Sequence, residues 1–330
     1  MSAASDLRFL ERAFALAAKV PARSTSPNPR VGCVLARGGK ILAEGAHLGY
    51  HRPHAEPTAL GKLPGRASGA TAYLTMEPCA PYRGKRNPSC AETLAGAGVT
   101  RVVCGSLDPN PKVAGRGLTA LRRAGVKAER LAGFQEAAEA LNRGFFSRMR
   151  RGRPWVILKT ALSLDGKAAA VTGKSRWVTG KKARTAVHRL RAEVDAILVG
   201  AGTVRADNPA LTAHGAGKNP LRVVLKGRKP LPKRARVFDA SAATAVYRAG
   251  TSAALRSVLK DLARAGVGVL LVEGGPTVHA SFLRAKLVDE VRVFLAPKLL
   301  SGSDDPSKAP CLKAPKMSRV GVDWLIEGVI

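Results

Sequence analysis

Blocks of apolar residues along this chain alternate between two periods, which predicts helices and strands in turn. Over 6–19 the apolar residues recur at helical spacing, whereas 30–36 and 40–46 are predicted strands joined by a Gly38-Gly39 turn. Further strands are predicted at 71–75 and 101–106, and further helices from about 54 onward, at 91–97, at 117–124 and at 134–147. Such alternation is typical of an α/β sandwich around a mostly buried sheet.

The same alternation starts again after a basic segment at 148–154 that contains Gly152 and Pro154. Strands are predicted at 155–161, 196–199, 221–225, 243–247, 267–272 and 291–295, and helices at 180–193, 252–265 and 277–286. The stretch 305–318, rich in Lys and Pro, is predicted to be a loop. We therefore predict two α/β domains, 1–147 and 155–330, with 148–154 as the linker.

The composition is that of a folded protein except for its charge. Of 330 residues, 45% are hydrophobic and 24% charged, so wholesale disorder is excluded. Lys and Arg number 55 against 23 Asp and Glu, which gives a formal net charge of +32. Such a field favours anionic partners: phosphorylated metabolites, nucleotide cofactors or nucleic acid. Because the excess is spread over both halves, we expect a generally basic surface and no nucleic-acid partner.

Cysteine usage and hydropathy bear on the location of the protein. Five cysteines, Cys33, Cys79, Cys90, Cys104 and Cys311, are too few for a disulfide scaffold of this size. No apolar run approaches the ~20 residues that a membrane span needs. Charged residues interrupt the N-terminal segment, which favours an amphipathic helix over a secretory signal. We therefore expect a cytoplasmic protein without membrane contact.

A metal signature lies in the first half. His54-Ala55-Glu56 is followed by Glu77-Pro78-Cys79 and then by Cys90. One His and two Cys make a three-ligand zinc set that leaves the fourth tetrahedral position for water. Zinc lowers the pKa of that water, and Glu56, not itself a ligand, suits the transfer of its proton to departing ammonia. The parts are common singly, but their combination predicts a zinc-dependent deaminase.

The spacing of the two cysteines departs from that of nucleobase deaminases, whose pattern closes with P-C-x-x-C. Here the ten residues 80–89 separate Cys79 from Cys90, and they include Arg83, Lys85 and Arg86. A basic loop beside the metal favours a substrate that carries a phosphate. The alternative is an ordinary solvated loop.

Together with two further strings, these motifs resemble the bifunctional riboflavin-biosynthesis deaminase–reductase family of the RibD type. Ser26-Pro27-Asn28-Pro29-Arg30-Val31-Gly32 precedes the predicted hairpin, and Asp108-Pro109-Asn110-Pro111-Lys112-Val113-Ala114-Gly115-Arg116-Gly117 is the most specific string. The resemblance implies an N-terminal cytidine-deaminase-like α/β/α domain that binds Zn²⁺ through His54, Cys79 and Cys90, with Glu56 as the proton shuttle.

The same resemblance implies a set of substrate contacts in this domain. Asn28, His47, Asp108 and Asn110 would hold the substrate, and Arg86 of the inter-cysteine loop would meet its phosphate. That loop is longer here than is usual in the family. For Asn28 and Asn110 the alternative is turn chemistry, which Asn beside Pro commonly serves.

A second set of strings stands in the second half, at 158–167, 175–179 and 200–209, and at Glu273-Gly274-Gly275-Pro276-Thr277. Small residues between a strand and a helix let backbone N–H groups approach a pyrophosphate. Gly200-Ala201-Gly202 alone lacks the third glycine of the dinucleotide fingerprint and could equally be a tight turn. Together the strings are similar to the reductase half of the same family, which implies a C-terminal dihydrofolate-reductase-like α/β domain that uses NADPH.

By position, the resemblance implies cofactor contacts at Leu162, Trp177, Thr203, Asp207, Gly227, Gly275, Pro276 and Thr277. It implies substrate contacts at Ser175, Arg191, Leu211 and His214, with Lys159 and Glu273 as catalytic residues. A hydride must reach the anomeric carbon of the sugar, and a proton must reach its ring oxygen. Lys159, Asp207 and Glu273 are the ionisable candidates, and the sequence does not rank them as proton donors. Their alternative roles are helix-end or surface charges.

Two positions depart from the family in the reductase half. His214 stands where the family has an arginine for the substrate phosphate, and a neutral histidine binds phosphate less firmly than a guanidinium. Arg205, Lys218 or Arg222 could substitute for it. Lys226 precedes Gly227 in a region that is often acidic in the family, where a cation could favour the extra phosphate of NADPH.

The leading interpretation is a bifunctional enzyme that deaminates a diamino-ribosylamino-pyrimidinone 5′-phosphate and then reduces the ribosyl side chain to ribityl with NADPH. We expect a small phosphorylated pyrimidine as the substrate and a homo-oligomer as the assembly. Three alternatives stay open: a nucleic-acid deaminase acting on transfer RNA with an accessory domain, a deaminase with an inactive reductase half, and a basic scaffold with a vestigial metal site. Zinc content, NADPH oxidation and the binding and deamination of transfer RNA distinguish them.

Overall fold

The computed structural model describes residues 3–63, 65, 67–81, 88–111, 113–172, 177–321 and 323–329. The chain divides into two compact units. One contains Met1–Trp155 with Leu259–Gly268, and the other contains Val156–Val258 with Val269–Ile330. The linker at 148–154 remains a prediction, and helix α6 (Arg143–Arg151) continues into that segment before Gly152 ends it in a left-handed conformation.

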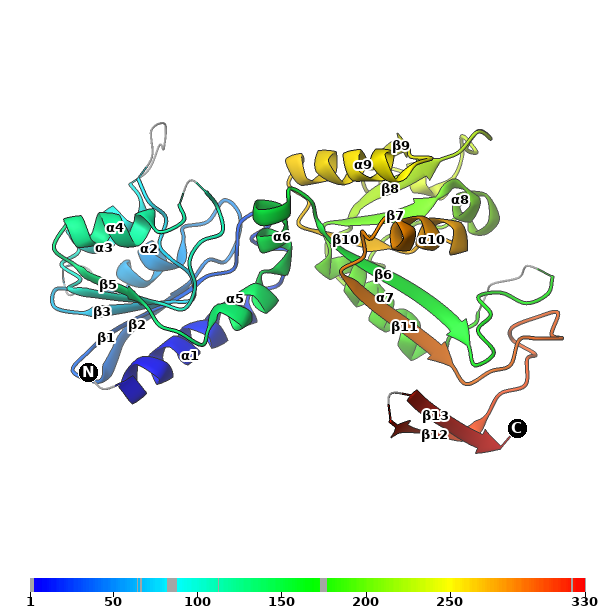
Figure 1. Cartoon of the computed structure of the whole chain (residues 1–330), viewed down its shortest axis with the longest axis horizontal. Helices are drawn as coiled ribbons and strands as arrows, with labels where there is room; N and C mark the ends of the chain where they lie inside the picture. Colours follow the sequence, from blue (N-terminus) through cyan, green and yellow to red (C-terminus); the bar gives the residue numbers. More distant parts are fainter. Residues whose placement is uncertain are drawn as a thin grey trace. The chain divides into compact units, whose positions relative to one another are not determined.

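The first sheet has five strands in the order β2 (Lys40–Ala46), β1 (Gly32–Arg37), β3 (Thr71–Leu74), β4 (Arg101–Cys104) and β5 (Lys127–Arg130) (Figure 1). Strand β1 runs antiparallel to both of its neighbours, whereas β3, β4 and β5 are parallel. The predicted hairpin forms at Gly38 and Gly39, both of which have positive φ angles. The sequence pattern missed β5, a short strand with charged residues at both ends.

Both faces of this sheet are covered, because strand side chains point alternately to one face and the other. Val34, Tyr73 and Val103 pack with Phe9 of helix α1 (Ala3–Lys19) on one face. Their strand neighbours form the core on the other face with helices α2 (Ala55–Leu60), α3 (Cys90–Gly96) and α4 (Arg116–Arg123). The predicted α/β/α sandwich is confirmed, and the residues of the metal signature lie on the α2–α3 side.

One predicted helix is divided. The segment predicted at 134–147 forms α5 (Gln135–Leu141) and α6, which meet at Asn142. The Asn142 side chain accepts a hydrogen bond from the Arg30 amide at 2.8 Å and donates one to the Arg30 carbonyl at 3.0 Å. These long-range bonds hold the residue outside helical geometry, and a local pattern cannot reveal them.

The second sheet has six strands in the order β11 (Glu290–Ala296), β6 (Trp155–Ser163), β10 (Val269–Val272), β7 (Ala196–Gly200), β8 (Leu221–Lys226) and β9 (Thr244–Arg248). The pairs β11–β6, β10–β7, β7–β8 and β8–β9 are parallel. The associated helices are α7 (Lys181–Glu193), α8 (Ala201–Asp207), α9 (Ser252–Arg264) and α10 (Pro276–Arg284). Short α8 was not predicted.

The prediction of a loop over 305–318 is wrong for its last part. Strand β12 (Lys313–Val320) pairs antiparallel with β13 (Asp323–Val329) in a separate two-stranded sheet. Backbone pairing with β13 makes this strand, although Lys and Pro dominate the local composition. Met317, Val320 and Trp324 of this hairpin are exposed.

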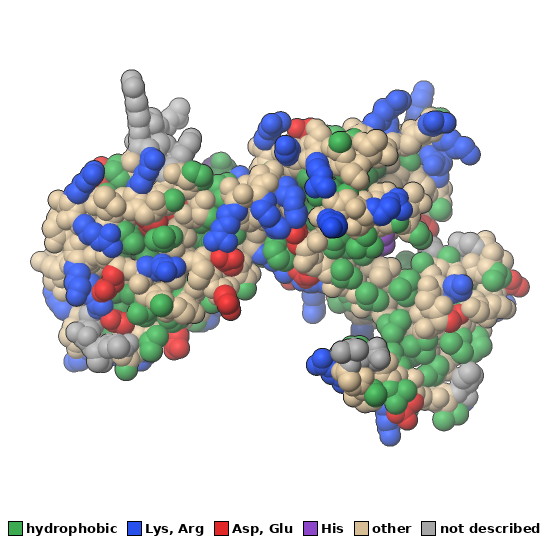
Figure 2. Space-filling model, in the orientation of Figure 1, with side chains coloured by type: hydrophobic (Ala, Val, Ile, Leu, Met, Phe, Trp, Pro, Cys, Tyr) green, Lys and Arg blue, Asp and Glu red, His purple; other side chains and the backbone are tan. Residues whose placement is uncertain are grey.

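Basic side chains are distributed over both units. Figure 2 shows Lys and Arg side chains scattered over the visible face of each unit. Among the described residues, no helix has the length and apolar character that a membrane crossing requires.

Candidate active sites

The three predicted zinc ligands converge in the first unit. His54 immediately precedes α2, Cys79 lies in the segment after β3, and Cys90 begins α3. Their candidate ligand atoms all lie within 4.8 Å of one another. The Nδ1 atom of His54 is 3.8 Å from Sγ of Cys79 and 3.3 Å from Sγ of Cys90.

The surroundings of these sulfurs suit a zinc ion. The backbone amide of Cys90 donates to Sγ of Cys79 at 3.2 Å, an interaction that favours the thiolate form. Ser89 caps α3 in a reciprocal pair with Glu92, which fixes the turn that presents Cys90. One imidazole nitrogen and two sulfurs at this spacing match a three-ligand catalytic zinc site.

Glu56 lies beside this set, in the first turn of α2, with its side chain only 3% exposed. Burial and the nearby Cys79 raise the pKa of this carboxyl, while His54 and a hydrogen bond with Cys90 oppose the shift. A buried carboxyl next to the zinc ligands, and not one of them, is placed to hold a proton in transit.

Helix α2 can bring His54 and Glu56 to the sheet because Gly45 has no side chain. A Cβ atom at Gly45 would lie 2.3 Å from the Ala55 carbonyl oxygen, closer than real contacts allow. The glycine in β2 therefore sets how closely α2 approaches.

His47 is fully buried against the same set. Its ring lies 5.0 Å from the His54 ring, edge to face, and its Nδ1 is 3.0 Å from the Pro53 carbonyl oxygen. Burial lowers the pKa of His47, so the neutral ring donates from Nδ1. Within the described part of the chain, Nε2 has no hydrogen-bond partner. An unpaired buried acceptor is costly, and a substrate donor would satisfy it.

Glu77 has a role that the sequence pattern did not reveal. Its buried carboxylate accepts hydrogen bonds from four backbone amides, those of Asp108, Gly115, Gly117 and Leu118, at 2.8–3.3 Å. Glu77 thereby ties the string at 108–117 and the start of α4 to the segment that carries Cys79. In the sequence, the feature that could have pointed to this role is the position of Glu77 in the Glu-Pro-Cys motif.

Gly117 allows the close approach of that string to the metal segment. A Cβ atom there would lie 2.0 Å from the Pro78 carbonyl oxygen. Any larger residue at position 117 would therefore clash with the backbone of Pro78, the residue just before Cys79, so the position requires glycine.

The remaining predicted substrate residues of this unit have mixed outcomes. Burial raises the pKa of Asp108 to about 6, and its Oδ1 accepts from the Asn110 amide at 2.8 Å. The backbone of Asn28 bonds with Thr25 in the turn before β1, which is the turn role considered above. Arg86 lies outside the described residues, so its predicted phosphate contact stays a prediction.

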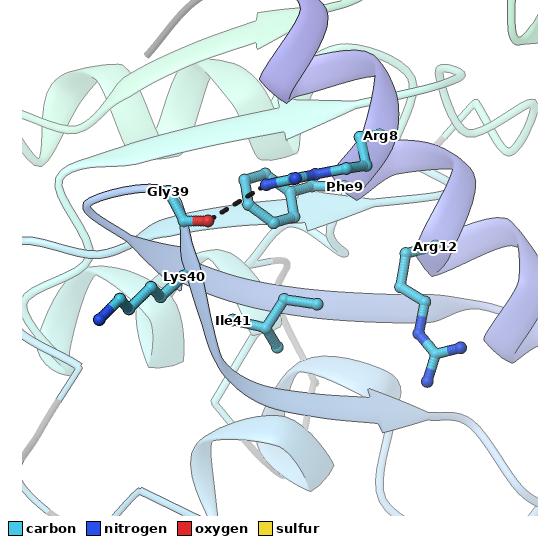
Figure 3. Close-up of a pocket in the computed structure, with 6 residues that line it drawn as sticks. All are labelled: Arg8, Phe9, Arg12, Gly39, Lys40 and Ile41. Atoms are coloured by element: carbon cyan, nitrogen blue, oxygen red, sulfur yellow. Dashed lines mark hydrogen bonds between the residues drawn. The ribbon is translucent and has the colours of Figure 1, made fainter.

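A separate cavity of about 490 Å³ lies on the opposite face of this sheet (Figure 3). It is lined by residues of α1, of the β1–β2 turn and of the start of β2: Arg8, Phe9, Arg12, Gly39, Lys40 and Ile41. Arg8 donates to the Gly39 carbonyl, and Arg12 forms an ion pair with Glu44 at 2.6 Å. This cavity contains none of the predicted site residues.

In the second unit, Glu273 joins two predicted site residues. It follows β10, and its carboxylate accepts from Nε and Nη2 of Arg191 on α7, at 2.8 and 2.9 Å. The Lys159 ammonium on β6 lies 3.6 Å from the same carboxylate. Burial by itself would raise the pKa of Glu273, but Arg191 and Lys159 outweigh it and hold the pKa at about 2.

The segment that contains Leu211 and His214 reaches the same place through Arg191. Nη1 of Arg191 donates to the Thr212 carbonyl at 3.2 Å, and the Ala213 amide donates to Asn219. Leu211 and His214 have left-handed backbone angles, with φ of 54° and 48°, a conformation that only a constrained segment maintains in such residues. His214 stacks on His188 of α7 with ring centroids 4.2 Å apart.

The predicted cofactor residues follow the carboxyl ends of neighbouring parallel strands. Gly275 follows β10, Thr203 follows β7, and Gly227 follows β8. Gly275 and Thr203 lie close together, since a Cβ atom on Gly275 would be 3.8 Å from the Thr203 hydroxyl. Ligands of open parallel sheets bind at this edge. Gly275 precedes α10, whose first residue is Pro276.

The other predicted cofactor residues are less closely connected. Leu162 lies in β6, paired with Leu295 of β11, and Asp207 ends α8. Thr277 is in the first turn of α10. The Trp177 ring is exposed, with the Arg184 guanidinium 4.3 Å from its centre. Ser175 lies outside the described residues.

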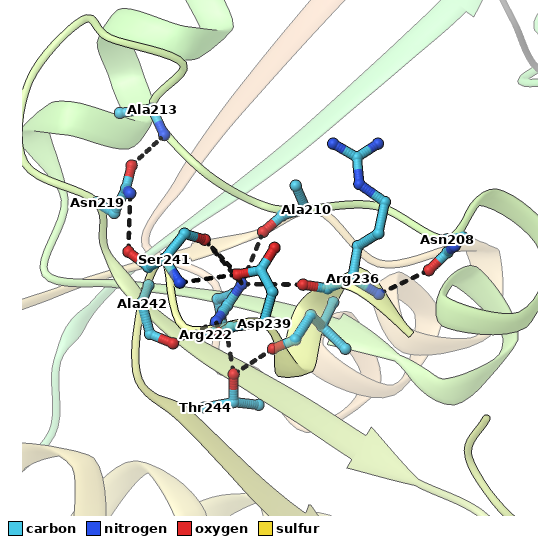
Figure 4. Close-up of polar contacts among 11 residues, drawn as sticks. Asn208, Ala210, Ala213, Asn219, Arg222, Arg236, Asp239, Ser241, Ala242 and Thr244 are labelled. Atoms are coloured by element: carbon cyan, nitrogen blue, oxygen red, sulfur yellow. Dashed lines mark hydrogen bonds and ion pairs between the residues drawn. The ribbon is translucent and has the colours of Figure 1, made fainter. Parts of the chain in front are cut away.

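Arg222 is not free to replace a phosphate-binding arginine. It is fully buried, and its guanidinium bonds to Asp239, Thr244 and the carbonyl oxygens of Ala210 and Arg236, among others (Figure 4). Arg222 therefore holds together the loops that flank β8, including the start of the segment with Leu211. The suggestion that it substitutes for the missing arginine is wrong on this geometry.

Comparisons with known proteins cover both units. A family model described as "Cytidine and deoxycytidylate deaminase zinc-binding region" matches residues 4–106, and one described as "RibD C-terminal domain" matches residues 154–326. The riboflavin biosynthesis protein RibD of Haemophilus influenzae is 37% identical over 326 residues, which cover 89% of this chain and 87% of that protein. That of Escherichia coli is 36% identical over 343 residues, covering 91% and 93%.

Solved structures give the same match over the full length. A diaminohydroxyphosphoribosylaminopyrimidine deaminase/5-amino-6-(5-phosphoribosylamino)uracil reductase from Thermotoga maritima has a TM-score of 0.81, 33% identity and 98% coverage of each chain. RibD of Acinetobacter baumannii in one form has a TM-score of 0.82 and 34% identity, covering 96% of this chain and 95% of that chain.

Proposed function

The chain belongs to the RibD family of bifunctional riboflavin-biosynthesis enzymes, and from that membership we propose which of its own residues carry out each reaction. It is a zinc-dependent deaminase and an NADPH-dependent reductase that acts on a small phosphorylated pyrimidine. Its similarity to RibD proteins over nearly the whole chain argues against a transfer-RNA deaminase and against a non-enzymatic scaffold.

For the deaminase, the observation that carries the proposal is the convergence of His54, Cys79 and Cys90 beside buried Glu56. These three residues would hold the zinc, which supplies Lewis acidity that makes water a nucleophile near neutral pH. Glu56 accepts a proton from the attacking water and delivers it to the amino group that leaves as ammonia. Its burial keeps this proton from exchanging with bulk solvent.

Substrate binding in this unit falls to residues at the edge of the same site. His47 offers its unpaired Nε2 to a donor of the pyrimidine. Asp108 is tied to the Cys79 segment through Glu77, and it accepts a hydrogen bond from the Asn110 amide. These two residues hold the polar groups of the substrate. Asn28 and Arg86 are retained as substrate contacts on the resemblance alone.

For the reductase, the contacts of Glu273 give Lys159 and Glu273 different roles in the transfer of the proton. NADPH supplies the hydride when it is bound, with Gly275, Thr203 and the other residues at the carboxyl edge of the sheet as its contacts. Glu273 stays ionised, because Arg191 and Lys159 hold its pKa at about 2. Such a carboxylate does not donate a proton near neutral pH. We propose that Lys159, whose ammonium lies 3.6 Å from this carboxylate, protonates the sugar oxygen, and that Glu273 orients it.

The assembly and location are proposed on independent grounds. Val291, Val293 and Leu295 of edge strand β11 are exposed on one face, which supports a homo-oligomer that covers them.

The five cysteines, all within the described residues, form no disulfide, which supports a reducing cytoplasm. The dispersed basic side chains support the absence of a nucleic-acid partner.

The experiment that tests the role of Glu56 separates the two reactions. Glu56→Gln should retain zinc but release no ammonia, and it should still oxidise NADPH when the deaminated intermediate is supplied. Glu11→Gln, an exposed change on α1, is the control and should leave both reactions unchanged. Ammonia release by Glu56→Gln at the wild-type rate would contradict the proton-shuttle role.

A further inference from the structure

The cavity between helix α1 and the start of strand β2, which we call the α1–β2 cavity, has no part in either proposed reaction (Figure 3). Its volume of about 490 Å³ is in the range of sites that bind small organic molecules. It lies at Lys40, the first residue of β2, whereas His47 of the deaminase site follows the other end of that strand. The length of the strand separates these two residues by about 20 Å, so the cavity is a separate place from the zinc site.

The cavity offers flat and apolar surfaces to a ligand. Phe9 is buried, with its ring packed 5.1 Å from that of Tyr73. The Arg8 guanidinium lies 4.8 Å from the centre of the Phe9 ring and donates to the Gly39 carbonyl at 3.1 Å, so it is held between the helix and the turn. Ile41, which also lines the cavity, is 44% exposed. A planar ring would cover Ile41 and stack on the fixed guanidinium plane.

The charged groups that line the cavity are cationic. Arg8, Arg12 and Lys40 line it, and its lining within the described part of the chain includes no Asp or Glu. The nearby Glu44 carboxylate accepts from Nε and Nη2 of Arg12, at 2.6 and 2.8 Å. Three cations and this one carboxylate leave a local charge of +2, which complements the charge of about −1.5 to −2 on a phosphate monoester. The Glu44 pair uses two of the five N–H donors of a guanidinium, so Arg12 has donors left for a phosphate oxygen.

The neighbouring sheet edge favours a small molecule over a peptide as the occupant. Strand β2 lies at the edge of the first sheet, and its register with β1 shifts between Leu35 and Ala36. The Lys62 ammonium donates to the backbone carbonyl of Glu44 on β2 at 2.6 Å. Lysines and bulges at a sheet edge oppose the addition of another strand.

We propose that the α1–β2 cavity binds a planar heteroaromatic phosphate ester, with the ring against Arg8 and Ile41 and the phosphate on Arg12 and Lys40. Nucleotides and flavin phosphates share this chemistry. The site uses no residue of the proposed deaminase or reductase, so it would bind its ligand while both of those sites are occupied.

Calorimetric titration of the full chain with AMP and with FMN tests the site. Saturating NADP⁺ is present throughout, so that the cofactor site of the reductase is occupied. The proposal predicts one saturable site for at least one of the two esters, and the tighter ester identifies the kind of ring, purine or flavin. Inorganic phosphate should bind more weakly than that ester, because it lacks the ring. Absence of saturable binding by both AMP and FMN would overturn the proposal.

Two variants separate the ring contact from the phosphate contact. Arg8→Lys keeps the charge but loses the flat guanidinium, so it should weaken the ester and its unphosphorylated parent, adenosine or riboflavin, alike. Lys40→Ala should raise the dissociation constant of the ester about fivefold and leave that of the parent unchanged. Unchanged affinity for the ester in both variants would overturn the assignment of the cavity.

Lys127→Ala is the matched control for general attraction of anions to a basic chain. Lys127 is the exposed first residue of β5, and Lys40 is the exposed first residue of β2, at the opposite edge of the same sheet. The two substitutions remove the same charge, but only Lys40→Ala should weaken binding of the ester. An equal rise of the dissociation constant in both variants would overturn the site.

Discussion

Arg191 of helix α7 donates two hydrogen bonds to the carboxylate of Glu273, at 2.8 and 2.9 Å, inside the second unit. The two residues are 82 positions apart in the sequence. This pair connects the strand that precedes the predicted cofactor segment to the segment that carries the predicted substrate residues. It is the structural centre of the proposed reductase site.

Replacing Glu273 with Gln should slow reduction strongly and leave deamination unchanged. Loss of one partner of a buried ion pair costs about 3–5 kcal/mol, because the other charge stays buried without compensation. We expect NADPH oxidation to fall by at least about 100-fold, while ammonia release keeps its rate. Glu290→Gln, which breaks a more exposed pair with Arg292, is the control and should have little effect. Similar rates for the two variants would contradict the role of Glu273.

The lowered pKa of Glu273 predicts that the free energy of unfolding depends on pH. Glu273 titrates at about 2 in the folded chain, below its ordinary value of 4.5, so the folded state binds this proton less readily than the unfolded state does. Its contribution to the free energy of unfolding is therefore present above about 4.5 and lost as the pH falls toward 2. Urea unfolding across this range should show the loss in the wild type. An identical pH dependence in Glu273→Gln would show that the carboxylate is not the source.

Glu77 should be required for the deaminase although it is not one of the proposed zinc ligands. In Glu77→Gln the amide can accept with one oxygen only, so some of the four backbone amides lose their acceptor. Each unsatisfied buried donor costs about 1–3 kcal/mol. We expect a lower free energy of unfolding for the first unit, a raised KM for deamination and unchanged reduction of supplied intermediate. A variant with wild-type KM and stability would refute the anchoring role.

Zinc content should depend on Cys90 and not on a cysteine outside the cluster. Cys90→Ser removes a thiolate ligand, so we expect zinc to fall well below one equivalent and ammonia release to be lost. Cys311 is exposed and distant in sequence from the cluster, and Cys311→Ser should keep full zinc. Metal analysis of both purified variants makes the comparison. Full zinc in Cys90→Ser would contradict the proposed ligand set.

Much of this arrangement could be predicted because the chemistry-bearing residues sit in short local motifs. The His54-Ala55-Glu56 string begins a helix, and the strings after β7 and β10 mark the edge of a parallel sheet. Their residue types already imply zinc and a nucleotide. The predicted strands of the two sheets were largely confirmed for the same reason, since burial follows local patterns of apolar residues.

What the sequence could not predict depends on contacts between distant segments. Glu77 binds amides 31 to 41 positions away, and Asn142 interrupts a helix through bonds to Arg30. Arg222 was suggested as a phosphate ligand because its charge was visible, whereas its burial was not. The sequence pattern gave His188 no role, because it is one residue of a predicted helix. The fold places its ring against the ring of His214.

The most direct test of the account is a mass analysis of the purified enzyme incubated with the diamino-ribosylamino-pyrimidinone 5′-phosphate, with and without NADPH. Without NADPH, the account predicts a product in which oxygen replaces one amino group, with release of ammonia. With NADPH, it predicts the same change followed by the gain of two hydrogens. A substrate that remains unchanged, or that gains hydrogens without losing its amino group first, would contradict it.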